Sequence, residues 1–371
     1  MGKFGKKNTV DLNPLHYNIG LLGESGIGKT TLMKEVCETL APEKNGEPGY
    51  LHLDIGREDG ADAIEGIFSE KVEDWNKFSD IIDDIVTNKT TDYPNLQTVI
   101  IDTYDQLLEL TEAQVIKMHN RENPDKPKIT SINSAYGGFG HGLDKVIDVL
   151  FDKLWELKEV NVHFIIICHT KSKDIEDPVT GETYQILTSN TSQRYFNAIK
   201  TKLHFLGVAF IDRNIAKEKS GSREINKVVG ETRVISFRDD NFSVDSKSRF
   251  ANIVDRIPLD KDAFIKALTD AIKSESLKSG KTEKELKSEQ TKRDKAAEKK
   301  AQEYEAEKLR EANDMTAREE YIALIRSKFN DLDTEKKTAI KSILAKYGMK
   351  ALNSEAPTEA LREVAEYIEN N

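Results

Sequence analysis

Cysteine is scarce in this chain of 371 residues, which contains only Cys37 and Cys168. Two cysteines are too few for a disulfide framework or a cysteine-rich zinc site, so a reducing cytoplasm is favoured. Long apolar runs are missing as well, and none approaches the roughly 20 residues that a membrane helix needs. The first residues, MGKFGKKNTVDLN, lack the apolar stretch of a secretory signal. We therefore expect a cytoplasmic protein that makes no use of a membrane.

An excess of positive charge is also absent. The chain has 55 Lys and Arg against 65 Asp and Glu, for a formal net charge of −10. This balance excludes a protein coated in basic charge, but it leaves room for a local basic groove that binds nucleic acid. At about 150 residues for each domain, the length allows two or three domains.

Apolar, strand-like runs alternate with amphipathic helical segments in the first two thirds of the chain. Three runs, YLHLDI (50–55), TVIID (98–102) and VHFIIICH (162–169), are apolar at nearly every position, which is typical of parallel strands covered on both faces. Helical periodicity appears in residues 75–86 and 142–160. This alternation predicts an α/β fold with a mostly parallel sheet between helices.

Composition divides the chain into four parts: an N-terminal extension (1–15), an α/β core (16–272), a charged segment (273–315) and a small helical module (316–371). The third part is rich in Lys, Glu and Ala, and it is either a disordered linker or a solvated helix. In the fourth part, Thr316 and Glu319 form a capping box that predicts a helix start. Asp333 is expected to cap a second helix, and a third is expected from about Thr358.

The string GESGIGKT, residues 23–30, lies between a short apolar run (16–22) and a helical segment (31–40). A strand, a G-x-x-x-x-G-K-[ST] loop and a helix form a P-loop, whose backbone N–H groups surround phosphates. We expect Lys29 to reach the β- and γ-phosphates of ATP, and Thr30 to hold Mg²⁺ by its hydroxyl. The expected nucleotide-binding residues are Gly23, Glu24, Ser25, Gly26, Ile27, Gly28, Lys29, Thr30 and Thr31.

Asp102 ends the run TVIID and is the expected second metal-binding residue, beside Thr30. The residue after it is Thr103, where many ATPases have a Glu that activates water. The catalytic acid must therefore come from another position. The neighbouring strand offers Asp54, Glu58 and Asp59, and Glu24 is a weaker choice; we favour Glu58 or Asp54.

Polar side chains also follow the run VHFIIICH. His169 ends it, and a side chain at this point either senses the γ-phosphate or is a hydrogen-bonded histidine at a strand end. Residues 177–181, DPVTG, then predict a turn between two extended arms. The long loop 123–142 carries Tyr136 and Phe139, which either stack on nucleic-acid bases or pack down as a lid.

These segments together resemble the phage-type AAA/RecA-like ATP-binding proteins, which include the single-strand annealing ATPases of phage recombination systems. The resemblance rests on GESGIGKT, TVIIDTYDQLLEL, AYGGFGHG, VHFIIICHTK with EDPVTGE, and SKSRFANIVDRIPLD, in this order over about residues 17–268. It implies a RecA-like P-loop core, with Lys29, Thr30 and Asp102 as site residues and His169 as the sensor. One departure is that Gly56 stands where RecA proteins have their catalytic Glu.

The resemblance also implies partners. It implies a homo-oligomer that shares nucleotide at its interfaces, acts on single-stranded DNA near a single-strand-binding protein, and works in the host cytoplasm if a phage encodes it. We expect ATP binding, and hydrolysis that is slow or stimulated by DNA, to promote annealing or strand exchange. The alternative is a nucleotide-dependent loader or interaction protein without direct DNA binding. A small-molecule phosphotransferase is disfavoured, because the sequence has no Arg-rich lid.

Overall fold

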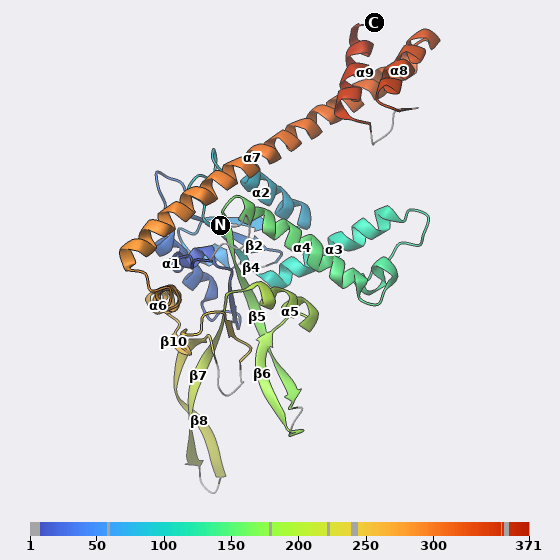
Figure 1. The fold of residues 1–371 in the computed structure, drawn as a ribbon. Helices are drawn as coiled ribbons and strands as arrows, with labels where there is room; N and C mark the ends of the chain where they lie inside the picture. The colour runs from blue at the N-terminus through green and yellow to red at the C-terminus, as the bar shows by residue number, and fades with distance from the viewer. Residues whose placement is uncertain are drawn as a thin grey trace. The chain divides into compact units, whose positions relative to one another are not determined.

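The computed structural model describes residues 8–57, 60–177, 180–220, 223–238, 244–349, 351 and 356–370. The chain separates into two units, residues 1–302 and 303–371. Figure 1 shows the helices and strands of both units as a ribbon.

A mostly parallel sheet forms the centre of the first unit, with the strand order β10-β8-β7-β1-β5-β4-β2-β3. Strand β1 pairs in parallel with β5 and β7, and β4 pairs in parallel with β5 and β2. The central order β7-β1-β5-β4-β2 is that of a RecA-like P-loop core, so the predicted fold class is confirmed. The strands are β1 (Ile19–Gly23), β2 (Tyr50–Ile55), β3 (Ser69–Val72), β4 (Thr98–Asp102), β5 (His163–Glu176), β6 (Thr183–Ser189), β7 (Phe205–Ser220), β8 (Arg223–Ser236), β9 (Lys247–Ser248) and β10 (Arg256–Pro258).

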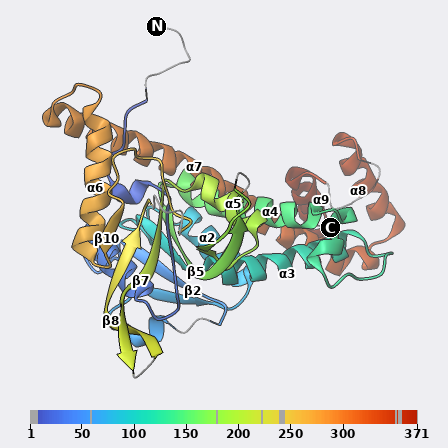
Figure 2. The ribbon, with the colours of Figure 1, turned by 90° about the horizontal axis from the view of Figure 1, so that it is seen from below.

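Helices cover both faces of this sheet (Figures 1 and 2). Helices α1 and α6 pack on one face, where their apolar residues share a core with alternate residues of β1 and β5. Helices α2, α3 and α4 contact one another on the other face. The helices of this layer arrangement are α1 (Lys29–Leu40), α2 (Trp75–Thr87), α3 (Tyr104–Glu122), α4 (His141–Glu159), α5 (Gln193–Lys202) and α6 (Lys261–Leu277), with short 3₁₀ turns η1 (Pro14–His16), η2 (Ala61–Ala63) and η3 (Ile132–Gly137).

Two hairpins extend the sheet beyond its carboxyl edge (Figure 1). Strand β5 pairs with β1 as far as His169, and from Thr170 onward it pairs antiparallel with β6. Strand β7 pairs in parallel with β1 and antiparallel with β8. The predicted hairpin after His169 is confirmed, although Pro178 and Val179 of its turn lie outside the described residues. Strand β7 is therefore both a strand of the parallel core and one arm of an antiparallel hairpin.

The first part of helix α7 (Glu283–Lys328) packs on the N-terminal segment of the same unit. The Gln290 side chain donates to Asp11 Oδ1 at 2.8 Å and accepts from the Leu12 backbone N–H at 2.9 Å. The Arg293 guanidinium bonds to Thr9 and lies 3.6 Å from Asp11 Oδ2. Residues 273–315 were predicted as one charged segment, whereas in the structure their beginning belongs to α6 and α7 of the first unit and residue 303 begins the second.

The second unit contains the end of α7, η4 (Phe329–Asp331), α8 (Thr334–Lys346) and α9 (Thr358–Asn370) around a small apolar core. The Asp333 carboxylate accepts from the Lys336 N–H and caps α8, as predicted. The predicted helix start at Thr316 is wrong, because Thr316 lies inside α7 and its hydroxyl donates to the Ala312 carbonyl. The Lys, Glu and Ala residues before it are good helix formers, so the helix continues through the capping box.

Among the described residues, no helix has both the length and the apolar character that a membrane crossing requires.

Burial of a histidine at the start of β5 makes the stability of the first unit sensitive to pH. Burial, and then the charges of His16 and Lys158, lower the pKa of His163 to about 3. In the unfolded chain this imidazole takes up a proton near pH 6.5, whereas the folded protein keeps it neutral down to about pH 3. The contribution of the neutral His163 to the free energy of unfolding is therefore complete above pH 6.5. It falls by about 1.4 kcal/mol for each pH unit as the pH drops toward 3.

We expect His163→Phe to flatten this pH dependence. The measurement is urea unfolding at pH 7, 6 and 5, with His141→Gln, a change at an exposed histidine, as the control. An unaltered slope in His163→Phe would contradict the assignment.

Candidate functional site

The loop between β1 and α1 has the curled backbone of a P-loop. Gly26 and Gly28 have φ values of 74° and 107°, which a residue with a Cβ rarely adopts. Gly28 is the N-cap of α1 and no side chain caps this helix end, so its first N–H groups can face an anion. Glu24, Ser25 and Gly26 are exposed at the loop tip.

The other predicted cradle residues lie deeper or further along. Gly23 ends the buried strand β1, Ile27 is buried, and Thr31 is exposed in the first turn of α1. Lys29 is only 6% exposed, and its ammonium group donates to the carbonyl oxygens of Gly23 at 3.0 Å and Glu24 at 2.9 Å. The lysine charge is therefore held against the loop backbone that would surround the phosphates.

Thr30 and Asp102, predicted to share a metal, lie side by side although 72 positions separate them in the sequence. The Thr30 hydroxyl donates to Asp102 Oδ2 at 2.5 Å. His52 Nε2 lies 3.2 Å from the same oxygen. One hydroxyl and one carboxylate beside a phosphate cradle are the oxygen donors that Mg²⁺ accepts in P-loop proteins, so the residues present fit this ion.

Of the candidates for the catalytic acid, the structure describes Asp54 and Glu24 but not Glu58 or Asp59. Asp54 is 4% exposed and lies in register with Asp102 on the neighbouring strand. Glu58 and Asp59 lie outside the described residues, so the choice between Asp54 and Glu58 stays a prediction. Gly56 has φ 73°, and a Cβ on it would lie 2.8 Å from Gln106 Oε1. The left-handed backbone, rather than the contact with the movable end of Gln106, favours glycine at the position where RecA proteins have a Glu.

His169 is held by an aspartate that the sequence analysis missed. Asp105, in the first turn of α3, lies 3.0 Å from His169 Nδ1 through Oδ2 and accepts from the His169 backbone N–H at 3.3 Å. Burial opposes the charged carboxylate, but the hydrogen bonds and charge of His169 outweigh it and lower the pKa of Asp105 to about 2. The carboxylate is therefore charged at ordinary pH and fixes the imidazole. Its position three residues after Asp102 was the only sequence signal.

Two further residues near the site were not found from the sequence. Arg233 of β8 donates from Nη1 to the Ile27 carbonyl of the P-loop at 3.2 Å, which ties the β7–β8 hairpin to the cradle. His52, which contacts Asp102, was not distinguished from its apolar neighbours in β2. Neither residue belongs to a motif, so no sequence signal indicated them.

In the loop before α4, the Phe139 ring is exposed and the Tyr136 ring is packed against a neighbouring side chain. Phe139 is 98% exposed and has φ 52°, whereas the Tyr136 ring packs edge-on against His119, with centroids 5.0 Å apart. Tyr136 is thus packed down, as one of the two alternatives expected, whereas the exposure of Phe139 leaves its stacking on bases a prediction.

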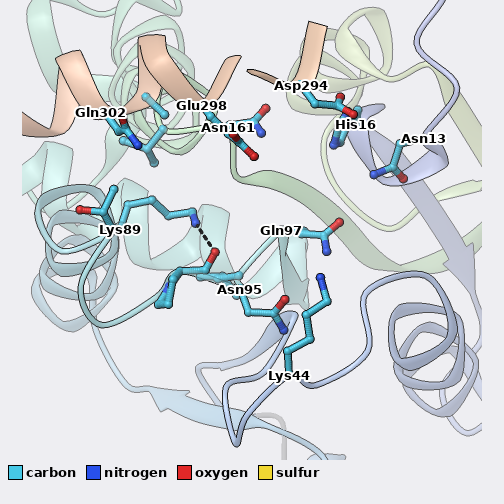
Figure 3. Close-up of a pocket in the computed structure, with 15 residues that line it drawn as sticks. Asn13, His16, Lys44, Lys89, Asn95, Gln97, Asn161, Asp294, Glu298 and Gln302 are labelled. Atoms are coloured by element: carbon cyan, nitrogen blue, oxygen red, sulfur yellow. Dashed lines mark hydrogen bonds between the residues drawn. The ribbon is translucent and has the colours of Figure 1, made fainter. Parts of the chain in front are cut away.

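A cavity of about 560 Å³ lies at the opposite, amino edge of the sheet, next to residues that precede β4 and β5 (Figure 3). Some of the polar side chains that line this cavity already donate hydrogen bonds to backbone carbonyls of the protein. Lys89 donates to the carbonyls of Tyr93 and Pro94, and Asn95 donates to Pro42 and Glu47. Since P-loop nucleotides bind at the carboxyl edge, this cavity is separate from the candidate site.

Comparison with known proteins finds a family that matches most of the first unit, including the P-loop. The profile of a family described as AAA domain matches residues 16–250. Among solved structures, a KaiC-like protein from the hyperthermophilic archaeon Pyrococcus horikoshii OT3 is similar at 14% identity and a TM-score of 0.35, over 66% of this chain and 85% of that one. No curated protein matches the chain.

Proposed function

We propose, from the premise that this chain belongs to the AAA domain family of P-loop ATPases, that it hydrolyses ATP and acts on single-stranded DNA in phage recombination or replication. It would work in the host cytoplasm as a homo-oligomer, with a single-strand-binding protein nearby. Lys29 would contact the β- and γ-phosphates, and Thr30 and Asp102 would hold Mg²⁺. The metal, when bound, neutralises charge on the phosphates.

One observation carries the proposed action on DNA. Strand β5 runs without a break from the catalytic sheet, where His169 pairs with Gly23 of the P-loop strand, into the projecting β5–β6 hairpin. A change at His169 on ATP binding or hydrolysis would therefore reach the hairpin through one continuous strand.

The base of this hairpin carries two exposed lysines. Lys171 donates to the carbonyls of Asn190 and Thr191, and Lys173 donates to Gln193 Oε1 at 2.5 Å. Both lysines are exposed residues, and positive charge on this hairpin suits a phosphate backbone. The displayed ring of Phe139 is suited to stacking on an unpaired base.

We expect the double variant Lys171→Glu, Lys173→Glu to bind single-stranded DNA at least about tenfold more weakly at low salt. The slope of log affinity against log salt should shrink by about 1.4, because two phosphate contacts are lost. Fluorescence anisotropy with ATP and Mg²⁺ measures both. Lys266→Glu on α6, where an exposed lysine pairs with Asp270, is the control.

The same binding measurement on the wild-type protein, together with its ATPase rate with and without DNA, decides between this proposal and the alternative. If wild-type protein binds no single-stranded DNA at low salt, and its ATPase rate is unchanged by DNA, the proposed action on DNA fails. A nucleotide-dependent loader or interaction protein then becomes the better reading, since it uses the same P-loop without touching DNA.

We further expect Asp105→Asn to lower ATP turnover by about 100-fold with little change in nucleotide affinity. The neutral amide loses the charge that holds His169, whereas the P-loop contacts stay intact. Steady-state kinetics and nucleotide titration separate the two effects. The control is Glu109→Gln at an exposed position of the same helix, and equal turnover in both variants would argue against a role for His169.

A further inference from the structure

We infer that His52 is a positioning residue for the Asp102 carboxylate, and that it makes Asp102 an effective magnesium ligand. This inference rests on the proposed function, in which Thr30 and Asp102 hold the metal of bound ATP. It adds a residue on β2 that contacts neither nucleotide nor metal in the proposed site.

The contact is buried and specific. His52 is 1% exposed, and its Nε2 lies 3.2 Å from Asp102 Oδ2. That oxygen also accepts the Thr30 hydroxyl. Strand pairing fixes the approach, because β2 and β4 are parallel neighbours with His52 opposite Ile100 and Asp54 opposite Asp102. The sheet therefore fixes the two backbone positions from which the imidazole and the carboxylate meet on one face.

The contact with Asp102 indicates which ring nitrogen of His52 carries the hydrogen. A carboxylate oxygen only accepts, so Nε2 must carry the hydrogen and donate to Asp102. In the neutral ring Nδ1 is then an acceptor. It is buried, and it has no hydrogen-bond partner among the residues that the structure describes. A buried acceptor without a partner costs about 1–3 kcal/mol.

Packing alone gives no reason to keep a histidine here. On the same face of the sheet, Ile100 of β4 lies opposite His52 and is fully buried and apolar, and an apolar side chain at position 52 would leave no unpaired nitrogen. What an apolar residue lacks is the bond to Asp102. Hydrogen bonds to ligating carboxylates orient them, and their loss typically lowers metal affinity by about 10- to 100-fold. The Nε2 bond would hold the carboxylate in place when the Thr30 hydroxyl turns to the metal.

The test compares His52→Phe, which keeps a ring but has no donor, with His52→Gln, which keeps an N–H donor. Fluorescent ATP analogue binding is titrated with Mg²⁺, and repeated in EDTA, and urea unfolding is measured without nucleotide. We expect His52→Phe to need about 10- to 100-fold more Mg²⁺ for half-maximal binding. Its affinity in EDTA should match wild type, its stability should be equal or higher, and His52→Gln should recover most of the Mg²⁺ response.

His163→Phe is the matched control, because His163 is also buried and both its ring nitrogens have no hydrogen-bond partner among the described residues. It should leave the Mg²⁺ response unchanged. A wild-type Mg²⁺ response in His52→Phe, or an equal loss of affinity with and without Mg²⁺ together with lower stability, would overturn the inference. If His52→Phe does not fold, His52→Gln is compared with His52→Asn, whose shorter amide is expected to miss Asp102, and equal Mg²⁺ responses would overturn it. Should wild-type binding not depend on Mg²⁺ at all, the proposed metal site fails instead.

Discussion

Lys29→Ala is expected to lower ATP turnover by at least about 100-fold, the loss typical of removing one preorganised group that stabilises transition-state charge. The Lys29 ammonium is buried and bonds to the carbonyls of Gly23 and Glu24. It therefore lies inside the loop that would surround the phosphates, and alanine removes its charge without altering the glycines that shape the loop. Phosphate release under saturating ATP and Mg²⁺ measures the effect.

The matched control for this variant is Lys34→Ala. Lys34 lies on the same helix and forms an i,i+4 pair with Glu38 at 2.9 Å, so its loss tests a lysine of α1 that lies away from the loop. Urea unfolding of both variants reports any effect on the fold. Turnover at the wild-type level in Lys29→Ala would contradict the assignment of the P-loop as the nucleotide site.

Asp102→Asn is expected to have the second large effect, a loss of about 100-fold in turnover. Asparagine has nearly the shape of aspartate and can still accept from the Thr30 hydroxyl or the His52 Nε2–H, so the fold should persist. The amide lacks the negative charge that attracts Mg²⁺. Nucleotide binding in EDTA should therefore stay near the wild-type value, while the Mg²⁺ needed for turnover rises.

A Mg²⁺ titration of ATP turnover measures this second effect, with Asp148→Asn at an exposed position of α4 as the control. If Asp102→Asn keeps the wild-type Mg²⁺ dependence, Asp102 is not a metal ligand. Combined with the His52 variants, the result separates loss of the ligand from loss of its orientation.

Local patterns predicted much of the fold. The runs at β2, β4 and β5 are apolar at nearly every position because parallel strands are buried on both faces, and the sheet confirms them. The helix start at Thr316 failed for a local reason as well, since a capping box inside a strong helix-forming segment does not end the helix before it. The identity of the catalytic acid stays open. The sequence offers two carboxylates, Asp54 and Glu58, with no feature that distinguishes them, and Glu58 lies outside the described residues.

The sequence by itself predicted the curled loop between β1 and α1, because its glycines, Lys29 and Thr30 all fall within eight consecutive positions. It also determined that Asp102 ends a buried strand. The Thr30–Asp102 pair was predicted from the motif, but only the tertiary structure shows that His52, 50 positions from Asp102, contacts the same carboxylate oxygen and that Asp105 holds His169. Such contacts depend on which strands are neighbours in the sheet, and strand order arises from the packing of the whole core.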